Sequence, residues 1–271
     1  MTIIDRRGDK RFGLGLAAIA AVALACPHFV AAQEVSIAAG SSWQLGDGGV
    51  DLDCATLRIG GTLEAADGHA AGIGDLLIAG EASASTALLE VGGEWINGGS
   101  FQAGDGVVHF TDRCDRAAAA VRGSTHFSTL AIDSARGKAY RFEAGATQSV
   151  AQALFLAGAA GTRMSIGSSF TGQQAGLALA PTGSQHVEWL AVSDMAAPEG
   201  SAWLAPGAPE DYHSVDAGNN LRWFKADPAP PIVPVSVPTT SGWALAVLCL
   251  ALFAGAQRAF RRGQAESSRR V

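Results

Sequence analysis

The side chains best suited to chemistry are four aspartates in two close pairs. Asp51 and Asp53 are two residues apart, so on a strand their carboxylates project from one face. Asp112 and Asp115 lie on either side of Cys114. Paired carboxylates can bind Ca²⁺ or act as general acid and general base in the cleavage of a sugar chain.

The surroundings of these carboxylates do not favour either use. We expect no arginine or lysine to be arranged as their partner, and neither an EF-hand loop nor the calcium-binding nonapeptide repeat surrounds them. In so acidic a chain we interpret them as solvated surface carboxylates. We therefore predict no catalytic residue, no metal site and no cofactor.

Histidine, serine and tryptophan also form no arrangement typical of an active site. The sequence has no H-x-x-x-H or HExxH spacing and no G-x-S-x-G elbow, so we predict that the protein is not an enzyme. Tryptophans can stack on sugars, although those at strand positions more often fill a core or cap an end. The histidines are His69, His109, His126, His186 and His213, and the tryptophans are Trp43, Trp95, Trp189, Trp203 and Trp223.

Cys54 and Cys114 are the two cysteines of the region 33–226. In an oxidising compartment such a pair usually forms a disulfide, and closing a loop of about 60 residues contributes about 4 kcal/mol in the chain-entropy model. We predict this disulfide. The alternative is two separate thiols, because a disulfide requires Cα atoms within about 7 Å of each other.

Short β-strands must position these residues, because one pattern recurs along the chain. An aliphatic residue, any residue and a second aliphatic residue precede a turn of small residues in segments 57–61, 76–80, 89–93 and 154–158. Side chains two apart share a strand face, so each segment predicts a short strand with one buried face. Further pairs with this period are Val35/Ile37, Val50/Leu52, Val108/Phe110, Leu130/Ile132, Tyr140/Phe142, Met164/Ile166, Leu177/Leu179 and Leu190/Val192.

Many short strands separated by Gly, Ser and Asn indicate either a β-solenoid or a β-sandwich. The patterns at Leu57, Leu76 and Leu89 begin 19 and 13 residues apart, which fits irregular coils better than even hairpins. Glycine and alanine at the corners would let successive coils approach closely. We predict an all-β, right-handed parallel β-helix, with a β-sandwich as the alternative.

The N-terminal segment has the order of parts of a secretory signal peptide. Basic residues, among them Arg6 and Lys10, precede the apolar run 12–25, and small residues follow. We predict a signal helix at 1–32 that uses the Sec translocon and is cut by signal peptidase between Ala32 and Gln33. Lipidation of Cys26 is the alternative.

The C-terminal segment has the parts of a membrane tether. A proline-rich linker at 227–237 precedes an apolar run at 243–256, whose 14 residues would span about 21 Å as a helix, against roughly 30 Å of hydrocarbon core. Arg258, Arg261 and Arg262 can snorkel and hold the C-terminus in the cytoplasm, which leaves the body of the chain outside. We predict a transmembrane helix at 243–256 in the inner membrane, and an ordinary single-pass anchor remains open.

The charge of the body excludes one class of partner. Residues 34–231 carry 10 basic and 22 acidic side chains, a net charge of −12. Such a surface repels nucleic acid and anionic lipid, both of which require clustered lysine and arginine. We therefore exclude nucleic-acid binding.

The start of the apolar tail carries a family resemblance. Its residues, with the short apolar helix and the arginines Arg258, Arg261 and Arg262 behind them, resemble the IPTL-CTERM sorting domain of Gram-negative bacteria, a relative of PEP-CTERM signals. Pro238, Thr239, Ser241 and Trp243 match the usual Ile-Pro-Thr-Leu-Ser-Glu-Trp, and Val237, Thr240 and Gly242 depart from it. The resemblance covers residues 238–271 and implies handling by an exosortase-like membrane enzyme.

The middle of the chain carries a second resemblance. Residues 95–110 are similar to the W-x-N-x-G-x-F-x-x-G-x-G-x-V-x-F element of bacterial β-helical surface proteins, and segments 123–130 and 216–223 resemble neighbouring elements of the same proteins. Together they cover about residues 50–224. Repeat patterns of this kind imply an architecture and no activity.

The sequence therefore predicts four parts: a signal peptide (1–32), a β-solenoid ectodomain (33–226), a linker (227–237) and a sorting signal (238–271). We expect an exported protein, tethered to the inner membrane and then located at the cell surface or outside the cell, with a structural or adhesive role. An extracellular polysaccharide is a candidate partner. Two alternatives are a carbohydrate-binding module, with exposed Trp and Tyr aligned along one face, and a polysaccharide lyase or hydrolase, with a carboxylate and a cation converging in an acidic groove.

Overall fold

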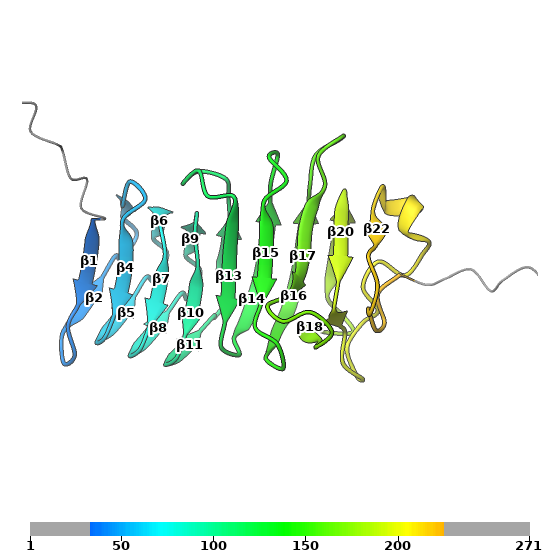
Figure 1. The fold of residues 1–271 in the computed structure, drawn as a ribbon. Coiled ribbons are helices and arrows are strands. Elements are labelled where there is room, and N and C mark those ends of the chain that lie inside the picture. The colour runs from blue at the N-terminus through cyan, green and yellow to red at the C-terminus, as the bar shows by residue number, and fades with distance from the viewer. Residues whose placement is uncertain (1–32, 225–271) are drawn as a thin grey trace, which may run out of the picture.

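The computed structural model describes residues 33–224, which wind into an all-β parallel solenoid of about eight turns (Figure 1). All pairings between its strands are parallel. The predicted solenoid is confirmed, and the sandwich is wrong because it needs antiparallel pairs. The predicted signal helix and transmembrane helix lie outside the described residues. Within 33–224, no helix has the length and apolar character needed to cross a bilayer.

Three sheets form the walls of the solenoid. Sheet A consists of β1 (Glu34–Ile37), β4 (Thr56–Ile59), β7 (Leu76–Ile78), β10 (Trp95–Asn97), β13 (Ala118–Arg122), β15 (Ala139–Phe142), β17 (Met164–Ser168), β20 (Leu190–Ser193) and β22 (Val215–Asp216). Sheet B consists of β2 (Ser42–Gln44), β5 (Thr62–Glu64), β8 (Glu81–Ser83) and β11 (Ser100–Gln102). Sheet C consists of β3 (Gly49–Asp51), β6 (His69–Ile73), β9 (Leu88–Val91), β12 (Val107–Phe110), β14 (His126–Asp133), β16 (Thr147–Ala157), β18 (Ala175–Leu179) and β21 (Met195–Ala196), and β19 (Ser184–Glu188) also pairs with β16.

The first four coils have three walls and the later coils have two. Strands β1–β3, β4–β6, β7–β9 and β10–β12 each make one three-walled coil, and sheet B ends with β11. The long strands β14 and β16, of 8 and 11 residues, then widen sheet C. The last coil carries β22 and the short 3-10 helix η1 (Pro209–Tyr212), at the yellow end of Figure 1.

Register explains the aliphatic pattern of the sequence. Leu57 pairs with Leu76, and Leu76 pairs with Trp95, so 19 residues make one coil here. Leu89 lies on sheet C, and its spacing of 13 residues from Leu76 therefore measures the distance between two walls of one coil. Predicted pairs such as Tyr140/Phe142 fall in strands and point into the core, because alternate residues of a strand share a face.

Glycine is required at one corner between sheets A and B. Gly61, Gly80 and Gly99 follow one another along the axis, and a Cβ atom at each would collide with a carbonyl oxygen of the preceding coil. Only a residue without a side chain lets the coils stack this closely. The predicted role of corner glycines is confirmed here.

The segment 95–110 forms one complete coil, β10–β12. The Trp95 ring is fully buried and contacts Phe101 edge-on at 5.0 Å and Phe127 at 5.2 Å between ring centroids. The Trp95 Nε1–H donates to Thr125 Oγ1 at 3.0 Å. These aromatic rings fill the core where sheet B ends and the cross-section changes.

The two ends of the solenoid differ. Trp223 and Phe224 are buried against the last coil, and Trp223 forms a parallel bridge with Leu204. At the other end, β1, β2 and β3 each pair on one side only within the described residues. The C-terminal end is therefore closed by its own chain.

Candidate functional site

Cys54 and Cys114 form a disulfide whose Cα atoms are 5.5 Å apart, so the predicted bridge is confirmed. Cys54 follows β3 in the first coil, and Cys114 follows β12 in the fourth. Neighbouring strands are about 4.8 Å apart, so the two corners should be separated by about 14 Å along the axis. One cysteine must therefore leave its own coil.

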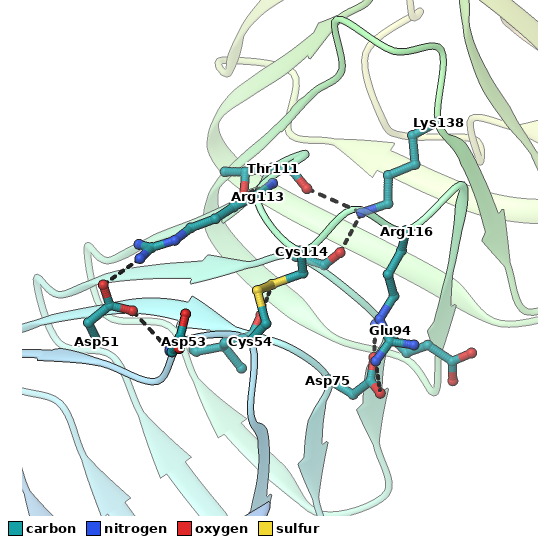
Figure 2. Close-up of a disulfide and its surroundings, with 12 residues drawn as sticks. Asp51, Asp53, Cys54, Asp75, Glu94, Thr111, Arg113, Cys114, Arg116 and Lys138 are labelled. Atoms are coloured by element: carbon teal, nitrogen blue, oxygen red, sulfur yellow. Dashed lines mark hydrogen bonds and ion pairs between the residues drawn. A yellow bond between two sulfur atoms is a disulfide. The ribbon is translucent and has the colours of Figure 1, made fainter. Parts of the chain in front are cut away.

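The connection between β12 and β13, residues 111–117, makes this move, and we call it the strap (Figure 2). It reaches back across the corner to the first coil through Cys114 and to the second through Arg116, whose Nη2 donates to Asp75 Oδ2 at 2.9 Å. Gly92 of the third coil leaves room for it, since a Cβ atom there would collide with the Cys114 side chain. The strap thus ties four coils together.

Three arginines pair with aspartates around the strap. Besides Arg116, which binds Asp75, Arg113 binds Asp51 of the first coil and Arg136 binds Asp115. The expectation that these carboxylates have no cationic partner is wrong. The pair Asp51–Arg113 could not be predicted from the sequence, because the two residues are 62 positions apart and are brought together only by the strap.

The two predicted carboxylate pairs do not act as pairs. β3 ends at Asp51, and Asp53 lies beyond it with a left-handed backbone, so the expectation that both project from one strand face is wrong. The Asp53 N–H donates to Asp51 Oδ1 at 3.0 Å, and this bond, with the Arg113 guanidinium next in effect, holds the pKa of Asp51 below its usual value. Asp112 instead accepts hydrogen bonds from the Ser134 hydroxyl, at 3.1 Å, and a backbone N–H.

Lys138 anchors the strap from inside and was not anticipated from the sequence. The residue is only 2% exposed, and Nζ donates to the carbonyl oxygens of Gly92, at 2.5 Å, and Thr111, at 3.2 Å (Figure 2). Nζ also lies 5.2 Å from the centre of the Tyr140 ring. Burial lowers the pKa of Lys138 and raises the pKa of Tyr140. The one signal in the sequence was the rarity of lysine, since Lys138 and Lys225 are the two lysines of residues 34–231.

An open groove lies on the outer face of sheet A, with a volume of about 590 Å³. Alanines of β13 line its floor, and the β17–β18 connection contributes Ser169 and Thr171. Its charged side chains are Arg122, Arg141, Glu94 and Glu143. Within residues 33–224, neither of these arginines forms an ion pair.

A second hollow, of about 300 Å³, brings His126 and Ser149 together. His126 Nδ1 and Ser149 Oγ are 2.9 Å apart, the distance of a serine nucleophile from its base. Glu199 lines the same hollow, yet no described carboxylate is hydrogen-bonded to His126. A nucleophilic triad also needs a group that orients the base.

The remaining histidines and the tryptophans are dispersed. His69, His109 and His186 lie near Glu90, Asp133 and Glu188 respectively, on different coils. No cluster of three metal-ligating side chains occurs in the part of the chain that the structure describes. Trp95 and Trp223 are buried, Trp43 lies in the first coil, and Trp189 and Trp203 lie near the other end, so these rings form no row along one face.

The predicted sorting residues Pro238, Thr239, Ser241, Trp243, Arg258, Arg261 and Arg262 lie outside the described residues, as does Ala32 of the cleavage site. No protein-family model matches the chain, and comparison with curated proteins and with solved structures finds no similar protein. Its function is therefore argued from its own residues.

Proposed function

We propose that this protein is exported and displayed at the bacterial cell surface, where it has a structural or adhesive role. The observation that supports this most is the Cys54–Cys114 disulfide, which joins the first coil to the strap. Structural disulfides persist in oxidising compartments and are rare in the cytosol. A solenoid that depends on one is suited to a place outside the cytosol.

In this proposal the two ends of the chain direct its export and its attachment to the membrane. The signal peptide at 1–32 directs the chain to the Sec translocon, and signal peptidase cuts before Gln33. The helix at 243–256 then holds the protein in the inner membrane until an exosortase-like enzyme acts on the segment around Pro238 and Trp243. The solenoid is right-handed in this proposal, as parallel β-helices of surface proteins are expected to be.

We assign the body of the protein no catalytic step. The carboxylates that suggested acid-base chemistry are used in contacts with the strap, such as those of Asp51 with Arg113 and of Asp75 with Arg116. We expect the outer face of the solenoid to bind polysaccharides without cleaving them. Incubation of the exported protein with a panel of bacterial and plant polysaccharides tests this, and shortening of any polymer would favour the lyase or hydrolase alternative.

Export and processing are tested by mass spectrometry of the mature protein from a Gram-negative host that expresses the full chain. We expect an N-terminus at Gln33 and a C-terminus upstream of the arginine cluster. A Pro238→Ala, Trp243→Ala variant should keep its tail and stay in the inner membrane. Ser236→Ala in the linker is the matched control and should be processed normally. An unprocessed wild-type chain in the cytosol would rule out the proposal.

A further inference from the structure

We infer that the groove on the outer face of sheet A binds a glycan that contains uronic acid, a sugar with a carboxylate. The inference rests on the proposed function, because such polymers are met outside the cell. It gives the adhesive role a ligand class and a location on the solenoid. The groove residues that support it are Arg122, Arg141 and Glu143.

Arg122 is the exception among the arginines of this chain. Eight arginines lie between residues 33 and 224, and seven of them donate a hydrogen bond to a carboxylate, a hydroxyl or a backbone carbonyl. Arg122 donates none to any described residue, although acidic side chains outnumber basic ones about twofold. It is exposed and lines the groove. An unpaired guanidinium in so acidic a protein is available for an anionic ligand.

Arg141 lines the same groove, and a hydrogen bond holds its guanidinium in place. It lies on β15 next to β13, which carries Arg122, and its Nη1 donates to Ser165 Oγ at 3.1 Å. Gly167 makes this position available, because a Cβ atom there would come within 3.0 Å of Nη1. The remaining N–H groups of Arg141 are left for a ligand. A guanidinium can bind a carboxylate through two parallel hydrogen bonds, which a lysine cannot do.

The groove also offers acceptors for hydroxyl groups. Glu143 follows β15, and one of its carboxylate oxygens accepts the Gly123 N–H at 2.7 Å. This bond fixes the side chain and leaves its second oxygen open. Glu94 lines the groove as well. A sugar ring that carries one carboxylate and several hydroxyls matches both sets of groups, because its carboxylate needs only the two arginines and its hydroxyls can donate to the two glutamates. Nucleic acid and anionic lipid instead require clustered cations, which the groove lacks.

One wall of the groove is the β17–β18 connection, which hydrogen bonds hold in place. In the β17–β18 connection, Ser169 Oγ accepts the Ala144 N–H at 3.0 Å, and the Gly172 N–H donates to Asp194 Oδ1 at 3.1 Å. Phe170 is not one of the lining residues, but it lies between two of them, Ser169 and Thr171, and is 60% exposed. The low floor consists of alanines such as Ala118 and Ala120. An exposed aromatic ring next to this wall can contact the apolar face of a sugar.

The test is a binding titration with the protein purified from cells that express the full chain, with its disulfide intact. The probes are fluorescently labelled oligomers of mannuronate and of galacturonate, each compared with a carboxyl-reduced form. The two uronates distinguish a bacterial source of the ligand from a plant source. We expect at least one charged oligomer to bind and its reduced form to bind at least tenfold more weakly.

Arg122→Ala should weaken binding roughly ten- to a hundredfold, and Arg122→Lys should restore only part of it. Phe170→Ala should weaken it a few-fold. Arg58→Ala is the matched control, because Arg58 lies on the same sheet but pairs with Glu34 outside the groove, and it should bind as the wild type does. Equal melting temperatures will show that these variants are folded.

Equal binding of charged and reduced oligomers, equal effects of Arg58→Ala and Arg122→Ala, or no binding at all would each overturn the inference. Its failure is separate from failure of the proposed function. A protein that is exported but does not bind uronates contradicts only the ligand assignment. A protein that binds them in the tube but stays in the cytosol contradicts only the export.

Discussion

The Tyr140 hydroxyl is buried without a hydrogen-bond partner among the described residues. Its ring packs edge-on against Phe110 at 5.7 Å and lies beneath Lys138. An unpaired buried hydroxyl has lost its water without compensation, so Tyr140→Phe should raise the free energy of unfolding by about 1 kcal/mol. Denaturant unfolding measures this. Tyr212→Phe, at a half-buried site, should change it less, and a clear loss with Tyr140→Phe would show that the hydroxyl has a partner.

Asp51 gives the strap a dependence on pH. Its pKa in the folded protein is lowered by the Asp53 N–H and by Arg113, relative to about 3.9 in the unfolded chain. Stability from this carboxylate is therefore complete above pH 4 and is lost as the pH falls through the folded pKa. Asp51→Asn should destabilise the protein at pH 7, and the difference from the wild type should shrink below pH 4. Unfolding curves at several pH values will show this, and a constant difference would contradict it.

At this scale the sequence identified the cysteines but not their neighbours. Cys54 and Cys114 could be paired by elimination in an oxidising compartment. The contact of Asp51 with Arg113 could not be found, because it depends on a connection that crosses three coils. Lys138 was hidden for the same reason, since its two carbonyl partners belong to other coils.

Among the elements, the strap should matter most for stability. The disulfide closes a loop of 60 residues, so replacing both cysteines by serine should lower the free energy of unfolding by about 4 kcal/mol. Amide exchange should rise most in β1–β9, the coils that the strap crosses. Arg116→Ala is the matched control, and it should cost at most about 1 kcal/mol because its ion pair with Asp75 is exposed. A loss of similar size in both variants would contradict this role of the disulfide.

Substitutions at two neighbouring corners, Gly80→Ala and Ala66→Gly, should change the free energy of unfolding in opposite directions. Gly80→Ala places a Cβ atom against the Gly61 carbonyl oxygen and should cost about 2 kcal/mol. Ala66 has a positive φ of 50°, where a side chain is unfavourable, so Ala66→Gly should stabilise the protein by up to about 1 kcal/mol. Thermal and denaturant unfolding of the two variants will compare them. Stabilisation by Gly80→Ala would contradict the close stacking of the coils.

The strands were largely predictable from the sequence, because each depends on local alternation. Patterns such as Leu57/Ile59 and Met164/Ile166 mark buried faces directly. The end of sheet B after β11 was not predicted, and neither was the contact there between Trp95 and Phe127, which lie on different coils. The groove could not be predicted from the sequence either, because Arg122 and Arg141 become neighbours only through the pairing of β13 with β15.

Over the whole molecule, the two ends of the solenoid are stabilised in different ways. Trp223 and Phe224 close the last coil, whereas the strap secures the first four coils from the side. The terminal coils of a solenoid have a neighbour on one side only and need such support. In this account the support of the first coil is a covalent bond that depends on the redox state of its surroundings, which links the fold to the compartment.

The most direct test of the account is the redox state and accessibility of Cys54 and Cys114 in intact cells. Cells that express the full chain are treated with a thiol-reactive polymer too large to cross the outer membrane, before and after reduction with an impermeant reductant, and the cysteine-containing peptides are identified by mass spectrometry. The account predicts no labelling before reduction and labelling of both cysteines afterwards. Two free thiols that react only after lysis would contradict it.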